Sequence, residues 1–278
     1  MRRALLPALL LPLACRQDFP PSWRITGLRV LAITLDPPDV APGSGTRVRV
    51  VTADPQSRAV SVRWVACPPV QGEETPGDFR CDSTLVRRGD GADFTLDAPP
   101  FPIGTASIPV ALRFEVCAGG AATVDDAGVG HCAGSESWEA TRTLHLRASD
   151  RNANPGLDDV LLDGMPWPAD GSSTVRVCAP GVTCEHTLRV VAAASARETY
   201  LSGGSDGGVS VPERLTARYY TTVGTLAGET VGDPSETVTS DLAMHWTAPS
   251  QAGTASFWFV LDDGRGGVSV ATRALTAR

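Results

Sequence analysis

Short stretches that alternate apolar and polar residues run through the chain from about residue 28 onwards. Within residues 60–66, Val60, Val62 and Trp64 fall on one face of an extended segment, and Ser61 and Arg63 fall on the other. A period of two is typical of a half-buried β-strand, so we expect the Val60 face to be buried. The same pattern predicts strands at 28–35, 46–53, 108–117 and 139–147.

The second half of the chain continues in the same way. Its apolar stretches predict strands at 157–163, 175–178, 188–193, 214–222, 237–246, 256–262 and 268–276. The last two strands form a predicted hairpin, because residues 263–267 (DGRGG) contain glycines that tolerate the positive φ of a tight turn. Many short strands separated by glycine and proline predict an all-β protein built from β-sandwiches.

A polar segment divides these two series of strands. Residues 149–156 (SDRNANPG) contain few apolar side chains, and we interpret them as a linker between one unit at 23–148 and another at 157–278. An internal repeat supports two copies of one fold, since ATRTL at 140–144 returns as ATRAL at 271–275. Aligning Phe114 with Phe259 requires a larger offset, which predicts an insertion of roughly 14 residues within 118–137 of the first copy.

The first 15 residues have the layout of an export signal. Two arginines precede an apolar run at 4–14 that is too short to span a bilayer as a helix, and Cys15 follows. This stretch resembles the signal of bacterial lipoproteins in Ala14 and Cys15, although Pro12 stands where that family has an aliphatic residue. The resemblance implies removal of residues 1–14, a lipid on Cys15, and a tether at 15–22. The membrane would then be a partner through this lipid, at the outer membrane or cell surface rather than the inner membrane. Plain secretion is the alternative.

From about residue 25 the chain resembles bacterial surface lipoproteins with tandem immunoglobulin-like domains. Trp64 on the expected third strand, the WTAP turn at 246–249 and the glycine-rich closing hairpin carry the resemblance. It implies two immunoglobulin-like β-sandwiches after the signal segment. Neither expected second strand, 46–53 or 188–193, contains a cysteine, so the inter-sheet disulfide of antibody domains is absent.

Six cysteines follow Cys15, and an even number beyond an export signal predicts three disulfides. The third and sixth strands of such a sandwich are antiparallel neighbours, so Cys67 and Cys117 would end at opposite ends of the unit, too far apart to bond. We therefore expect the local pairs Cys67–Cys81, Cys117–Cys132 and Cys178–Cys184. The first two either hold loops 68–80 and 118–137 rigid for recognition or only stabilise an exported fold. Because the cysteine spacing does not match zinc sites, we expect no metal site.

Charge excludes one class of partner. Without residues 1–14 the chain carries 22 arginines against 31 acidic residues and contains no lysine, a formal charge of −9. Nucleic acids and anionic lipid headgroups attract clustered cations, so we expect no nucleic-acid partner. The missing lysine also excludes lysine-dependent chemistry such as Schiff-base catalysis.

No serine-nucleophile elbow, zinc-protease motif, phosphate-binding loop or dinucleotide fingerprint occurs in the sequence. We expect no enzyme and no cofactor, although aspartates in the predicted loops leave calcium as an alternative. The function predicted is a surface or periplasmic interaction module that binds an envelope or surface protein. A carbohydrate-binding protein with exposed aromatic residues and a hydrolase with an unrecognised site are the alternatives. The candidate contact residues are Asp125, Asp126, His131, Trp138 and Trp258, with Trp167, Tyr219 and Tyr220 as further sugar-platform aromatics.

Overall fold

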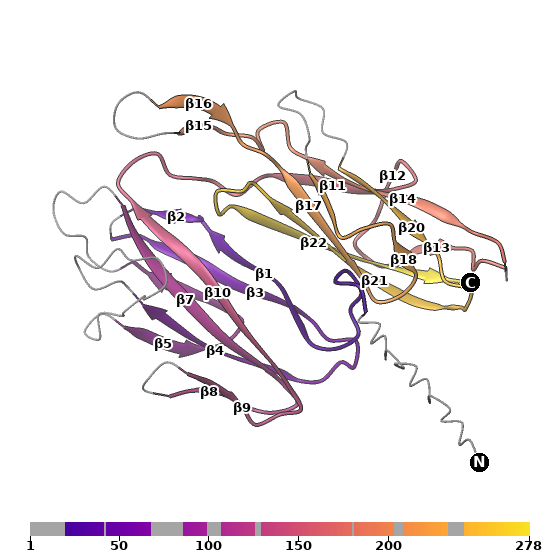
Figure 1. Cartoon of the computed structure of the whole chain (residues 1–278), viewed down its shortest axis with the longest axis horizontal. Helices are drawn as coiled ribbons and strands as arrows, with labels where there is room; N and C mark the ends of the chain where they lie inside the picture. Colours follow the sequence, from indigo (N-terminus) through magenta and orange to yellow (C-terminus); the bar gives the residue numbers. More distant parts are fainter. Residues whose placement is uncertain are drawn as a thin grey trace, which may run out of the picture.

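A computed structural model describes residues 20–41, 43–67, 86–98, 107–125, 129–179, 181–202, 208–232 and 242–278. These residues form strands joined by turns and bends, with no helix among them, which confirms the all-β prediction. The described residues therefore include no helix with the length and apolar character needed to cross a membrane. Figure 1 shows two groups of strands, β1–β10 and β11–β22, lying side by side.

Strands β1–β10 form a sandwich with two main sheets. One sheet has the order β1-β3-β6 and the other β2-β10-β7-β4-β5, with β2 parallel to β10 and the other neighbours antiparallel. In immunoglobulin notation these orders are A-B-E and A′-G-F-C-C′. The strands are β1 Arg29–Asp36, β2 Asp39–Val40, β3 Gly45–Ala53, β4 Val60–Cys67, β5 Arg87–Asp90, β6 Asp93–Asp97, β7 Ser107–Ala118, β8 Ala122–Val124, β9 Gly130–Cys132 and β10 Glu136–Arg147.

An aromatic stack joins the two sheets of this first sandwich. The ring of Trp64 on β4 stacks on Phe94 of β6 with a centroid separation of 4.1 Å, and Phe94 lies 6.5 Å from Phe114 of β7. Val62 is buried, and Val60 and Trp64 pack against the same core, which confirms the predicted buried face. Strand β3 contains no cysteine, as expected, so aromatic packing links the sheets where an antibody domain has a disulfide.

Strands β11–β22 form a second sandwich of the same plan. Its sheets have the orders β12-β11-β14-β20-β18 and β13-β22-β21-β17-β19, and β13 again pairs in parallel with the last strand, β22. The strands are β11 Leu157–Leu162, β12 Met165–Pro166, β13 Ser173–Val175, β14 Glu185–Ala192, β15 Thr199–Ser202, β16 Val209–Pro212, β17 Thr216–Thr221, β18 Thr225–Leu226, β19 Thr230–Gly232, β20 Ala243–Thr247, β21 Gly253–Asp262 and β22 Val268–Ala277.

Aromatic side chains packed edge to face fill the second core. Trp167, Trp246, Tyr219, Phe257 and Phe259 are each at most 1% exposed, and their ring centroids lie 5.0–5.9 Å apart in T-shaped pairs. The sheet-to-sheet contact is again aromatic, and β14 contains no cysteine.

Two strand predictions in this half need correction. The strand expected at 175–178 ends at Val175, because the residues that follow turn towards the Cys178–Cys184 disulfide. The strand expected at 237–246 begins at Ala243 among the described residues, while 237–241 lie outside them. The hairpin β15–β16 was not predicted; its strands pair only with each other among the described strands.

The two closing hairpins share one register. Phe114 lies opposite Ala140 in the first sandwich, and Phe259 lies opposite Ala271 in the second. On the neighbouring strand, Trp64 and Tyr219 face these two phenylalanines. The internal repeat is therefore confirmed at the level of residue pairs, and the extra residues of the first copy form the hairpin β8–β9.

The two sandwiches share a buried apolar joint. The outer surfaces of β1 and β3 pack on the outer surface of the sheet formed by β17, β21 and β22 (Figure 1). At most 8% of each side chain in this cluster is exposed, and its members are Ile25, Leu31, Val51, Ala53, Tyr220, Val260 and Val268. This joint holds the two sandwiches face to face over part of their length.

A buried polar network borders the joint at the segment expected to be a linker. Asn152 is 3% exposed; its backbone N–H donates to Asp39 Oδ2 at 2.9 Å, and its Nδ2 donates to Asp263 Oδ2 at 2.8 Å. Two residues later, Asn154 Nδ2 donates to the carbonyl oxygen of Leu35 at 2.7 Å. Residues 152–154 are thus hydrogen-bonded to both sandwiches. These bonds restrict the movement of one sandwich relative to the other.

Candidate functional site

A disulfide holds the inserted hairpin against the first sandwich. Cys117 on β7 is bonded to Cys132 on β9, with a Cα–Cα distance of 5.3 Å, and Cys178 is bonded to Cys184 in the second sandwich. Both pairs confirm the expected local pairing. Cys67 is also disulfide-bonded, while its expected partner Cys81, the lipidation candidate Cys15 and the candidate loop 68–80 lie outside the described residues.

The hairpin β8–β9 is closed by local hydrogen bonds at its tip. The backbone N–H of Asp125 donates to the Val129 carbonyl at 3.0 Å, and the Val129 N–H donates to Asp125 Oδ1 at 2.8 Å. His131 Nε2 lies 3.4 Å from Asp125 Oδ2, with both side chains exposed. Asp125 and His131 are thus brought together as candidate contact residues, and Asp126 lies outside the described residues.

A serine on β4 fastens the base of this hairpin to the sheet. Ser61 Oγ donates to the Gly120 carbonyl at 3.0 Å and accepts from the Ala122 N–H at 2.6 Å. The disulfide and these two bonds fix the hairpin at separate points. As a result, the hairpin is held over the outer face of the sheet instead of extending into solvent.

Glu115 lies beneath the hairpin on that outer face. Its side chain shares a cross-strand row with Arg63 on β4 and Glu139 on β10, and only 6% of the residue is exposed. A Cβ atom at Gly130 would overlap the Glu115 carboxylate, so the hairpin passes very close to it. Burial, and then the negative charge of Glu139, raise the pKa of Glu115, while His131 acts in the opposite direction.

A small recess opens between the hairpin and the sheet. Its free volume is only about 10 Å³, and it is lined by Val65, Arg113, Phe114, Glu115, Val124, Gly130 and Glu139. Pockets for drug-sized ligands usually enclose about 300–1,000 Å³. The recess therefore has room for about one water molecule and not for a ligand of that size.

The two candidate tryptophans occupy different settings. Trp138 lies at the start of β10 and is 38% exposed, with the Arg29 guanidinium 5.8 Å from its ring centroid. Trp258 packs against the apolar joint between the sandwiches. Trp138 is the more exposed of the two, whereas Trp258 is partly buried and packs against the joint.

The other aromatic residues considered for a sugar platform are buried. Trp167 and Tyr219 are each 1% exposed in the second core, and Tyr220 is 5% exposed in the joint. The prediction that they form a binding platform is wrong, because Trp167 and Tyr219 lie inside the second core and the joint between the sandwiches covers Tyr220.

The aspartates considered for calcium have arginine or backbone partners. Asp93 is bonded to Arg47 at 2.7 Å, Asp262 to Arg218 at 3.1 Å, and Asp263 accepts from the Gly267 N–H at 2.9 Å. Within the described ranges, no three histidine, cysteine or acidic side chains are grouped so that they could hold a metal ion.

Two residues of this region were missed by sequence reasoning. Alternation along β7 places Glu115 on the outer face with Arg113, but it does not show that a later insertion folds back over this face. Arg29 was missed for a related reason. Its ring partners, Trp138 and Tyr220, come from different sandwiches, and their meeting depends on the joint.

No protein-family model matches this chain, and no curated protein matches it. Among solved structures, the tandem Ig repeats of Dlar share 10% identity over 90% of this chain and 97% of that chain, with a TM-score of 0.24. The FN1–FN3 domains of chicken CNTN1 share 10% identity over 90% of this chain and 64% of theirs, with a TM-score of 0.22. Dimeric latent PorU from Porphyromonas gingivalis shares 9% identity over 91% of this chain, with a TM-score of 0.24, and this chain spans only 24% of its length.

These similarities are too distant to support any statement about a ligand or an activity. The class of protein is defined instead by the strand orders of this chain. Both halves place A-B-E against A′-G-F-C-C′, and in the second half β12 and β18 add an edge strand on either side of A-B-E. The chain is an all-β protein with two immunoglobulin-like sandwiches in tandem.

Proposed function

We propose that this protein is an exported, non-catalytic interaction module of the bacterial cell envelope, anchored by a lipid on Cys15. Its units would be the sandwiches at 23–148 and 157–278, and its partner an envelope or surface protein. The export signal at 1–14 supports the location, and the disulfides Cys117–Cys132 and Cys178–Cys184 suit an oxidising compartment.

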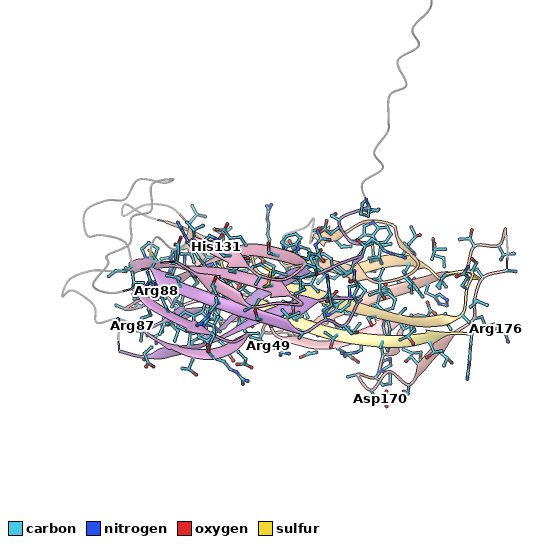
Figure 2. The ribbon with its side chains drawn as sticks, turned by 90° about the horizontal axis from the view of Figure 1, so that it is seen from below. Arg49, Arg87, Arg88, His131, Asp170 and Arg176 are labelled. Carbon is cyan, nitrogen blue, oxygen red and sulfur yellow. A yellow bond between two sulfur atoms is a disulfide. The ribbon has the colours of Figure 1, made fainter. Side chains whose placement is uncertain are left out.

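The observation that carries the proposal is the fixed hairpin on a fixed pair of sandwiches. The disulfide and Ser61 hold β8–β9 on the outer face of the first sandwich, and the buried joint holds that sandwich to the second. A surface that is ordered before binding loses little conformational entropy when a partner docks. Figure 2 shows His131 of this hairpin at the surface, near the end of the molecule that carries Arg87 and Arg88.

Metabolic labelling with palmitate tests the anchor. The unaltered protein should incorporate label and partition with membranes, and Cys15→Ala should abolish both. The matched control replaces Cys178 and Cys184 together by alanine, which removes two cysteines far from the signal and should leave labelling unchanged. Undiminished labelling of Cys15→Ala would reject the lipid anchor.

Site-specific photo-crosslinking in cells tests the interaction surface. A photoreactive amino acid at position 131 on the hairpin should give a discrete protein adduct, whereas one at position 170, which Figure 2 places on the second sandwich, should not. Adducts of equal intensity at both positions, or none at 131, would reject the hairpin as the contact surface.

Trp138 keeps a carbohydrate-binding function as the second candidate, because the residue is 38% exposed. Glycan-array binding that disappears in Trp138→Ala would favour this function over protein recognition. The stack of Arg29 on the same ring already occupies part of the surface that a sugar would need.

A further inference from the structure

The residues just before β1, the first strand of the first sandwich, are bound to the second sandwich. The backbone N–H of Ile25 donates to the Thr221 carbonyl and the Thr221 N–H donates to the Trp23 carbonyl, both at 3.0 Å. This pair of bonds forms a parallel β-bridge between Arg24 and Thr221 at the end of β17. Residues 22–25, which we call the strap, therefore cross to the sandwich that lies later in the chain.

Side chains on both sides of the strap strengthen this attachment. Arg24 Nη1 donates to the Gly224 carbonyl at 2.6 Å, and the Ser22 hydroxyl bonds to the Glu229 carboxylate. Trp23 packs against the core of the second sandwich, and Ile25, 2% exposed, lies in the apolar joint. The strap combines backbone bonds, a buried apolar residue and a charged hydrogen bond within four residues.

Arg29 connects the strap to the first sandwich. Its guanidinium bonds to the Ser22 carbonyl and lies 5.8 Å from the Trp138 ring centroid and 5.6 Å from that of Tyr220. Trp138 belongs to the first sandwich and Tyr220 to the second. Arg29 therefore links the strap to both sandwiches at the joint.

The strap lies close to the proposed lipid attachment in the sequence. Only seven residue steps separate Cys15 from Ser22, and a fully extended chain of that length spans at most about 25 Å. A lipid on Cys15 would therefore keep the strap, and the end of β17 to which it is bonded, within that distance of the headgroups.

We propose that the strap, because it is bonded to the second sandwich, holds that sandwich rather than the first one next to the membrane. The turn after β17, at residues 222–224, then faces the lipid headgroup surface. This inference rests on the proposed lipid anchor. Its consequence is an orientation in which the end of the first sandwich carrying Arg87 and Arg88 lies farther from the bilayer than the turn. Figure 2 places these two arginines at one end of the long axis and Arg176 of the second sandwich at the other.

Energy transfer to the bilayer tests this orientation. The lipidated full-length protein is reconstituted in phosphatidylcholine vesicles whose headgroups carry an acceptor dye, with a donor fluorophore on an unnatural amino acid at position 225 or 87. Transfer from 225, next to the turn, should exceed transfer from 87. Equal transfer from the two positions, or stronger transfer from 87, would overturn the proposal.

Variants of the strap supply the control. The double variant Trp23→Ala and Arg24→Ala should lose the difference between positions 225 and 87, whereas Arg49→Ala, an exposed arginine on β3, should preserve it. A difference that persists in the double variant would overturn the role of the strap. Protection of the β21 and β22 amides from hydrogen exchange verifies that the double variant is folded; if it is not, the single variant Arg24→Ala replaces it, with a reduced difference expected.

The strap and the anchor fail in distinguishable ways. In the unlipidated protein, the Thr221 and Ile25 amides should exchange faster in the strap variant than in the unaltered protein, a result that does not depend on any lipid. Unchanged exchange would reject the strap, whereas palmitate labelling that persists in Cys15→Ala would reject only the anchor.

Discussion

Single residues show both the reach and the limit of periodicity. Alternation correctly placed Val62 and Trp64 towards the core, because the face of a strand follows from its own sequence. The partner of Trp64 is Phe94, which belongs to the opposite sheet, and strand periodicity contains no information about contacts across a sandwich. Glu115 illustrates the same limit for a polar residue that a later segment covers.

The raised pKa of Glu115 predicts that this residue lowers the free energy of unfolding at neutral pH. The folded protein retains this proton above pH 4.5, where the unfolded chain loses it, so stability falls as pH rises through the raised pKa. Glu115→Gln should therefore be more stable than the unaltered protein at pH 7 and similar to it at pH 4. Thermal melts of both proteins from pH 4 to pH 7 measure this difference in stability. The pKa of the buried Glu213 is also raised, but its contribution is the same in both proteins and cancels in the comparison.

An exposed carboxylate provides the control for that experiment. Asp158→Asn should shift the melting temperature little at either pH, because Asp158 is an exposed residue of β11. If Glu115→Gln melted at the same temperature as the unaltered protein at pH 7, the carboxylate would not be destabilised by burial under the hairpin.

Removing the buried hydroxyl of Tyr219 should lower the stability of the protein. It donates to the Leu242 carbonyl and accepts from the Val190 N–H at 3.2 Å, so Tyr219→Phe leaves buried backbone groups with fewer partners. The expected loss is about 1–2 kcal/mol of unfolding free energy, measured by urea denaturation. Tyr200→Phe is the control, since it keeps the ring that contacts Arg265 and should change stability much less.

Elements were more predictable than their placement. The offset between Phe114 and Phe259 located the insertion, and the cysteine spacing located its disulfide, because both are properties of the chain order. That the inserted hairpin folds over Glu115 depends on Ser61 and Gly130, which give no signal in the sequence. Short edge strands such as β18 and β19 were missed for a similar reason, since two or three residues carry no measurable period.

The two disulfides whose cysteines are both described should contribute unequally to stability. Replacing Cys117 and Cys132 together by serine opens a loop with a sequence separation of 15 and should cost about 3 kcal/mol. The same change at Cys178 and Cys184, separated by 6, should cost about 2 kcal/mol. Denaturation under non-reducing conditions compares them, and a larger loss for the shorter loop would contradict the loop-entropy explanation.

Two separate glycine-to-alanine substitutions test how closely the hairpin β8–β9 approaches the sheet. Gly130→Ala introduces a methyl group into the space of the Glu115 carboxylate and should cost about 1–3 kcal/mol, because the hairpin or Glu115 must move. Gly232→Ala places its methyl at least 4 Å from every other described residue beyond its chain neighbours and should be close to neutral. Hydrogen exchange of the β8–β9 amides should rise only in Gly130→Ala, and unaltered protection there would show that the sheet accommodates the methyl.

At the scale of the molecule, the joint was the feature that sequence reasoning did not find. Residues 149–156 are polar, which indicated a linker, yet Asn152 is buried and bonded to both sandwiches. A signal was present in strands with apolar residues on both faces, such as Val50 with Val51 and Tyr219 with Tyr220. A strand that is apolar on both faces is covered on both sides, and here the second cover is the other sandwich.

Val260 offers the sharpest test of whether the two sandwiches move as one body. It is fully buried in the joint but lies on the outer face of β21, so Val260→Asp introduces a charge between the sandwiches while Phe257 and Phe259 still fill the second core. A buried carboxylate without a cationic partner is costly, and separating the sandwiches exposes it to water. Small-angle scattering should therefore show a larger radius of gyration, with exchange protection retained in β7 and β21. Leu201→Asp, at a site 72% exposed on the hairpin β15–β16, should leave the scattering unchanged. An unchanged radius in Val260→Asp would mean that the polar contacts at Asn152 and in the strap hold the pair without the apolar joint, and then Val260→Asp combined with Asn152→Ala and Arg24→Ala should separate them.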